Sequence, residues 1–264
     1  MYMGGYKMDD NIRSEIIELF VRNEWDRAID LIMKNRPKFL YKYRSGALRN
    51  IESLKNGKIW ISRATELDDV EEGRVFLDPI FKSAVKAMAQ AEDKYKDPKY
   101  EYTVNNIAEI TQKEMFVCSL AELYTNDDMW DRYADHSKGF CIEYKFDEIF
   151  CFDKNGLICL PVTYGDKEPL RPGDFKDANN WVFSALYRKN EIGNQGQDWK
   201  GQREWRIACF KKTLGKLQKP EGTLISVPTP SRIIIGKKAS DDLKKQLSDT
   251  VAGMKANIEL KELD

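Results

Sequence analysis

The sequence predicts a mixed α+β fold in which strands and helices are grouped rather than strictly alternating. Its 42% of apolar and 33% of charged residues are the balance of a folded globular chain. Most of the predicted strands lie in the second half, at residues 115–120, 140–144, 157–164, 204–210, 223–227 and 233–235. Runs of strands interrupted by groups of helices are typical of α+β proteins, and 264 residues are near the upper limit for a single hydrophobic core.

The first 37 residues form a predicted helical appendage, and residues 38–264 the main domain. Asp9 and Asp10 precede apolar residues at helical spacing, so they are expected to cap a first helix. A second helix follows from Trp25 and ends before Pro37, which disfavours helix in the residue before it.

The main domain is expected to begin with two strands that flank a short helix. The strands lie at 39–43 and 59–61, and Gly57 ends the helix between them. Pro98 separates helices predicted at 79–95 and 100–113. Later elements are a short helix at 130–133, a longer one at 179–189, a mobile loop at 193–197, a helix at 241–255 and a closing strand at 258–260.

Composition excludes several classes of protein. Lys plus Arg equal Asp plus Glu at 43 each, so no global field attracts DNA or an anionic membrane. Five cysteines without a CxxC pair predict reduced, buried thiols and a cytoplasmic protein. With one histidine, a zinc site or a Ser-His-Asp triad is not expected, and no apolar run has the length of a membrane span.

Three segments carry candidate site residues, and the first is basic. Lys42, Arg44 and Ser45 lie at the turn between the first strand and its helix. Cationic side chains and helix N–H groups at such a place suit a phosphate or a ribose hydroxyl. The alternative is a solvated basic turn.

The second segment joins a strand to an aromatic helix. Ser119 lies at the end of an apolar strand, and Trp130 and Tyr133 follow one helical turn apart. A serine and an aromatic ring are suited to form the wall of a pocket and to stack on a flat ligand. Core packing of the two aromatic residues is the alternative.

The third segment contains Gln202 and Glu204. If the strand at 204–210 extends back, the two side chains share one face. The carboxylate would stabilise positive charge on a reacting ribose, and the amide would orient an acceptor. The alternative is a surface glutamate paired with Arg203 or Arg206.

Two further charged runs remain open to interpretation. Four lysines beyond the Glu204 strand favour a polyanion near the site, although a solvated lysine face explains them better; they are Lys211, Lys212, Lys216 and Lys219. An acidic turn offers carboxylates for a divalent metal in a nuclease, namely Asp68, Asp69, Glu71 and Glu72. No phosphate-loop, dinucleotide, metalloprotease or hydrolase motif occurs.

These blocks together resemble a known family. Leu-Tyr-Lys-Tyr-Arg-Ser at 40–45, the acidic turn at 67–73, Cys-Ser before Met-Trp-x-x-Tyr-Ala, and Gln-x-Glu-Trp-Arg at 202–206 are similar to the domain-of-unknown-function 2971 family of bacterial proteins, from about residue 39 to 236. The opening segment, Ser119 and Gln202-x-Glu204 also resemble ADP-ribosyltransferases, which carry His or Arg on a first strand and a Gln-x-Glu or Glu-x-Glu pair later. Lys42 stands where the histidine subclass has its histidine.

The second resemblance implies an ADP-ribosyltransferase-like split β-sheet with flanking helices. It implies NAD as the substrate, bound near Lys42 or Arg44 and Ser119, with Glu204 and Gln202 catalytic. The acceptor would be a nucleic acid or a protein, and the setting a bacterial toxin or phage-defence effector, with an antitoxin or partner protein left open. A non-catalytic nucleotide- or partner-binding module is the alternative.

Overall fold

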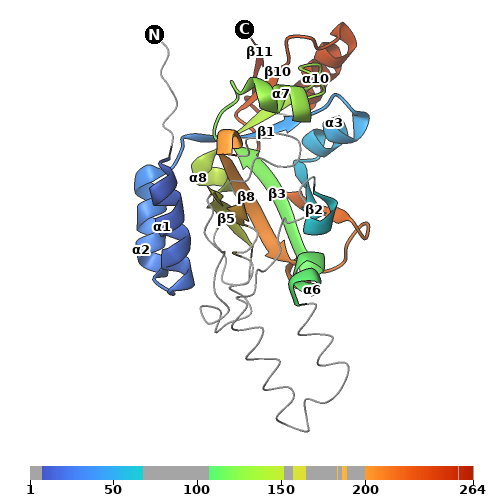
Figure 1. Ribbon diagram of the computed structural model, residues 1–264. Helices are drawn as coiled ribbons and strands as arrows, with labels where there is room; N and C mark the ends of the chain where they lie inside the picture. The colour runs from blue at the N-terminus through green and yellow to red at the C-terminus, as the bar shows by residue number, and fades with distance from the viewer. Residues whose placement is uncertain are drawn as a thin grey trace, which may run out of the picture.

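A computed structural model describes residues 8–67, 107–151, 157–164, 183, 186–188, 200–254 and 256–263, and it confirms the mixed α+β fold (Figure 1). Its main sheet is mostly antiparallel in the order β11-β10-β4-β1-β3-β2-β9, with β8 paired to β3 and β5 to β8. The strands are β1 (Phe39–Arg44), β2 (Lys58–Arg63), β3 (Met115–Ala121), β4 (Phe140–Lys145), β5 (Ile158–Pro161), β8 (Glu204–Phe210), β9 (Gly222–Ser226), β10 (Arg232–Ile235) and β11 (Glu259–Glu262). A separate parallel pair consists of β6 (Thr163–Tyr164) and β7 (Tyr187–Arg188).

The sheet divides at β3. One edge of β3 pairs with β8 along its whole length, from Met115 to Ala121. The opposite edge is shared, because Ala121 pairs with β1 whereas Phe116 and Val117 pair with β2. In the described parts of the chain, the strand registers leave residues 118–120 without a partner on this side. The strands β1 and β2 therefore diverge and leave a gap in the sheet.

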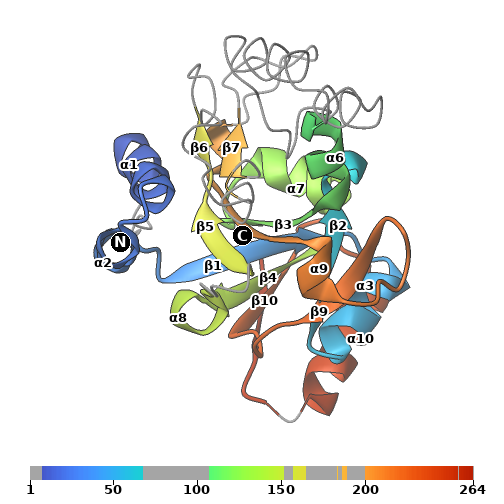
Figure 2. The ribbon, with the colours of Figure 1, turned by 90° about the horizontal axis from the view of Figure 1, so that it is seen from below.

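Helices pack around this sheet. They are α1 (Asp10–Val21), α2 (Trp25–Asn35), α3 (Leu48–Lys55), α6 (Ile107–Glu114), α7 (Asp127–Tyr133), α8 (Phe146–Ile149), α9 (Lys211–Leu214) and α10 (Asp241–Gly253). The α1–α2 pair lies at one side of the sheet, and α3 and α10 lie together at the other (Figure 2). Among the described helices, none is long and apolar enough to cross a membrane.

The first helix begins where the sequence predicts. Asp9 is its N-cap, and the carboxylate accepts a hydrogen bond of 2.8 Å from the amide of Asn11. Ile16 and Phe20 of α1 belong to the same hydrophobic cluster as Phe116 and Trp205 of the sheet. The N-terminal helices thus share the core of the main domain.

A smaller cluster covers the opposite face of β1. Because side chains alternate along a strand, Leu40 joins the large cluster whereas Tyr41 and Tyr43 join the small one. Trp130 of α7 packs against Tyr43, with ring centroids 5.2 Å apart in an edge-to-face arrangement. This cluster holds α7 against the sheet next to the gap.

Several predicted segments lie outside the described residues. They are the whole helix at 79–95, the loop at 193–197, and the acidic turn beyond Leu67. Most of the helix predicted at 179–189 also lies outside them, but its described residues Tyr187 and Arg188 form the strand β7, so the helix prediction is wrong there.

Candidate functional site

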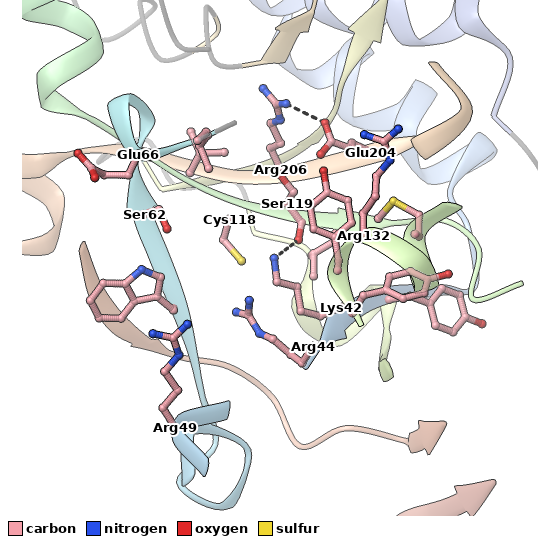
Figure 3. Close-up of a pocket in the computed structure, with 18 residues that line it drawn as sticks. Lys42, Arg44, Arg49, Ser62, Glu66, Cys118, Ser119, Arg132, Glu204 and Arg206 are labelled. Atoms are coloured by element: carbon pink, nitrogen blue, oxygen red, sulfur yellow. Dashed lines mark hydrogen bonds and ion pairs between the residues drawn. The ribbon is translucent and has the colours of Figure 1, made fainter. Parts of the chain in front are cut away.

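A cavity of about 690 Å³ opens at the gap between β1 and β2 (Figure 3). Its floor is the unpaired edge of β3, its walls are β1 and β2, and the start of β8 closes one end. Five cationic side chains and two carboxylates line it: Lys42, Arg44, Arg49, Arg132, Arg206, Glu66 and Glu204. A volume and a charge excess of this kind suit an anionic ligand of small-molecule size.

The structure brings five of the eight predicted site residues to this cavity. They come from four elements that are distant in the sequence and are Lys42, Arg44, Ser119, Tyr133 and Glu204. Ser119 is the one partly exposed residue of β3, whose other six residues are buried. The three sequence segments therefore converge on one place.

The other three predicted residues lie elsewhere. Ser45 accepts a hydrogen bond from the Asn50 amide at its carbonyl (3.0 Å) and at its hydroxyl (3.1 Å), and it faces a second cavity. Trp130 is 1% exposed, and its indole N–H donates to the Tyr124 carbonyl at 2.6 Å. It is a core residue rather than a wall of the cavity, because its ring packs on Tyr43.

Gln202 lies beside the cavity but not on the Glu204 strand. It ends a 3₁₀ turn at 200–202, and Arg203 then takes a φ of 47° before the strand begins at Glu204. The strand alternation therefore does not extend to Gln202, contrary to the sequence expectation. Its buried amide donates to the Tyr133 hydroxyl at 3.4 Å, so it contacts the site through Tyr133.

Lys42 stabilises the gap in the sheet. Its ammonium donates a hydrogen bond of 2.6 Å to the carbonyl of Ser119, a group that faces the unpaired edge of β3. Burial lowers the pKa of Lys42 from 10.5 to about 8. The lysine thus takes the place of a missing strand partner for one backbone carbonyl.

Arg44 extends into the cavity from the same strand (Figure 3). Within the described residues, its guanidinium has no hydrogen-bond or ion-pair partner. Burial lowers its pKa, and the neighbouring charge of Arg49 acts in the same direction. Two guanidinium groups that repel each other across a cavity form a suitable place for an anion.

Glu204 is held at its amide, its carbonyl and its carboxylate. Its N–H donates to the Tyr164 hydroxyl at 2.9 Å, and its carbonyl accepts from the Arg13 guanidinium at 2.8 Å. Its carboxylate forms an ion pair of 2.7 Å with Arg206, two residues along the strand. Glu204 is 4% exposed and Arg206 1%, so the sequence alternative of a paired glutamate is right about pairing and wrong about a surface location.

A buried charged network surrounds the start of β8. Arg13 of α1 forms an ion pair with Glu122, which also accepts from the indole N–H of Trp205 at 3.0 Å and from Arg203 at 2.9 Å. Arg13 also donates to the carbonyl of Val162 at 3.1 Å. Because Arg13 is fully buried, this network fixes the N-terminal helix to the backbone of Glu204.

The sequence analysis did not predict three of the arginines that line the cavity as site residues. Arg206 shares a strand face with Glu204 at a spacing of two, so strand alternation contained a signal for it. Arg49 and Arg132 lie on the helices α3 and α7, and a basic residue on a short helix carries no such signal.

The basic stretch beyond β8 is remote from Glu204. Lys211 and Lys212 begin α9 at the opposite end of the seven-residue strand, which places them about 20 Å from Glu204 at roughly 3.3 Å per residue. The sequence expectation of a polyanion contact beside Glu204 finds no support in this arrangement.

No group of three His, Cys, Asp or Glu suited to a metal ion occurs among the described residues. The carboxylates of the nuclease hypothesis, at 68–72, lie outside them.

One family model matches the chain. It is described as "Protein of unknown function (DUF2971)" and covers residues 129–207, from α7 to the middle of β8. The match supports the family resemblance over a shorter range than the motifs indicate. No curated protein and no solved structure matches the chain.

Proposed function

We propose that this protein is an NAD-dependent ADP-ribosyltransferase that acts at the cavity between β1 and β2. The supporting observation is that Lys42 and Arg44, Ser119 and Glu204 come from three strands and line one cavity at a split in the sheet. In the ADP-ribosyltransferases that the sequence resembles, the corresponding positions hold NAD and catalyse transfer.

The cavity offers the chemistry that the reaction needs. The glycosidic bond between the ribose and nicotinamide breaks, and nicotinamide leaves with the electron pair. The ribose carbon then carries positive charge, which the carboxylate of Glu204 stabilises. An acceptor nucleophile forms the new bond and loses its proton. Gln202, through its contact with Tyr133, lies where it would orient that acceptor.

Arg44 is a better candidate than Lys42 for the diphosphate of NAD. The ammonium of Lys42 already donates to the carbonyl of Ser119, so a ligand would have to compete with that bond. Arg44 has no partner among the described residues, and its planar guanidinium suits two phosphate oxygens at once. The sequence left this choice open, and the contacts favour Arg44.

Labelled NAD and the Glu204→Gln variant test the proposal. The amide of glutamine still accepts a hydrogen bond from Arg206, so the fold should persist while the negative charge is lost. Wild type should consume NAD and transfer the label to a fraction of cell lysate. Glu204→Gln should lose at least 100-fold in rate, as expected when a major electrostatic contribution is removed.

The matched control is Glu148→Gln, which removes an exposed carboxylate on α8 that pairs with Lys145 at 2.8 Å. This variant should retain the wild-type rate. A Glu204→Gln protein with wild-type activity would refute the assignment of Glu204.

The alternative function is a non-catalytic nucleotide-binding module. The ion pair between Glu204 and Arg206 favours it, because one carboxylate oxygen is already engaged. Under this alternative the wild type binds a nucleotide other than NAD, as measured by calorimetry, and it neither binds NAD nor releases nicotinamide from it.

A further inference from the structure

A second cavity lies directly beside the first. Its volume is about 750 Å³, and the two cavities share Arg132 and Tyr133 as a common wall. The turn before α3, the turn after α7 and the turn before α10 form its remaining walls. A ligand that passes over Tyr133 would therefore occupy both cavities.

The second cavity has an excess of positive charge. Arg132, Lys138 and Lys238 line it, against one carboxylate, Asp135. Arg132 pairs with Asp128 at 3.2 Å. Both lysines are exposed, and in the described parts of the chain neither side chain forms a hydrogen bond or an ion pair. The overall charge of the protein is zero, so this excess is a local feature.

Backbone hydrogen bonds fix the segments that carry the two lysines. The Lys238 amide donates to the Ser137 carbonyl at 2.9 Å, and the Lys138 amide to the Asp135 carbonyl at 3.0 Å. Three successive residues, 135–137, have φ between 50° and 65°. At Gly236, a side chain would come within 2.2 Å of the Ser137 carbonyl oxygen. The lysine backbones are thus set in place before any ligand binds.

Cations beside an aromatic ring match the chemistry of single-stranded nucleic acid, in which phosphates need positive charge and bases need a stacking surface. Tyr133 is partly exposed between the two cavities and supplies such a ring. An acidic peptide would use the same cations but not the ring.

We propose that the second cavity binds the phosphates of a single-stranded nucleic acid, and that this strand passes over Tyr133 toward the first cavity. The role of this nucleic acid as the ADP-ribose acceptor rests on the proposed function. Its binding does not rest on that function, since binding involves neither NAD nor Glu204.

Fluorescence anisotropy with a labelled twelve-nucleotide single-stranded RNA, in the absence of NAD, tests binding. If Arg132, Lys138 and Lys238 each contact one phosphate, the affinity for RNA should fall about 20-fold between 50 and 200 mM salt. In Lys138→Ala/Lys238→Ala only the Arg132 contact is left, so the affinity should fall only about 3-fold over the same range. The double variant should also bind more weakly than wild type at 50 mM salt.

The matched control is Lys211→Ala/Lys212→Ala, which removes two exposed lysines at the far end of β8. It should bind RNA like the wild type. The inference is overturned if the wild type does not bind RNA, if both double variants lose affinity equally, or if labelled poly-glutamate binds as tightly as RNA.

The NAD assay separates this inference from the proposed function. RNA binding without NAD consumption would refute the proposed transferase activity and support the nucleic-acid site. NAD consumption without RNA binding would support the transferase activity and refute the nucleic-acid site.

Discussion

Arg13→Met should destabilise the protein far more than a typical change on an N-terminal helix. The guanidinium of Arg13 is fully buried, pairs with Glu122 and donates to the carbonyls of Val162 and Glu204. Methionine fills a similar volume but supplies no donor. Among the described residues, the carboxylate of Glu122 then keeps Arg203 and Trp205 as its partners.

Removal of one partner from a buried ion pair costs about 3 to 5 kcal/mol. Since Glu122 keeps two donors, we expect a loss at the lower end, about 3 kcal/mol. Urea unfolding measures this free energy. The control is Arg22→Met at the C-cap of the same helix. The pair of Arg22 with Glu18 at 3.4 Å is exposed, so the loss should be at most about 1 kcal/mol. Equal losses for the two variants would refute the assignment of a structural role to Arg13.

Two further variants probe the gap in the sheet. The lowered pKa of Lys42 means that between pH 8 and 10 the unfolded chain binds more protons than the native state, so this residue makes stability rise with pH. Urea unfolding of Lys42→Met should lack this rise, and equal pH dependence in the two proteins would contradict the assignment. At Gly139, a side chain would come within 2.1 Å of the Arg44 carbonyl oxygen, so Gly139→Ala should cost about 1 to 3 kcal/mol. At Gly253 in α10, an added Cβ would meet no described atom within 4 Å apart from chain neighbours and the helix's own backbone, so Gly253→Ala should be neutral or stabilising by up to about 1 kcal/mol. An equal loss at both glycines would show that the close approach at Gly139 is unimportant.

Local patterns predicted the elements of the fold well because local chemistry decides them. Asp9 caps α1 through its own carboxylate, and the strand at 204–210 begins and ends as the apolar run predicts. Strand pairing follows from contacts between distant residues, so the branch at β3 had no local signal.

At the candidate site too, contacts between distant residues decided what the local sequence pattern could not. Spacing placed Trp130 and Tyr133 one helical turn apart but did not show which one faces a cavity. The contact with Tyr43 buries Trp130 and leaves Tyr133 at the wall. Arg13 did carry a signal, since it lies three and seven residues before Ile16 and Phe20 on the apolar face of its helix. A charged residue on such a face needs a buried partner, which here is Glu122.

The family match includes only part of the residues that line the cavity. The matched residues, 129–207, include Arg132, Glu204 and Arg206, whereas Lys42 and Arg44 precede them. The proposed transferase site therefore combines residues of the matched segment with residues of β1, and the Arg13 network fixes the start of β8 from still earlier in the chain. Because Arg13 contacts the backbone of Glu204 and not its carboxylate, any effect of α1 on catalysis must act through the position of that residue. Helix α1 thus helps to position the start of β8, although the family match does not include this helix.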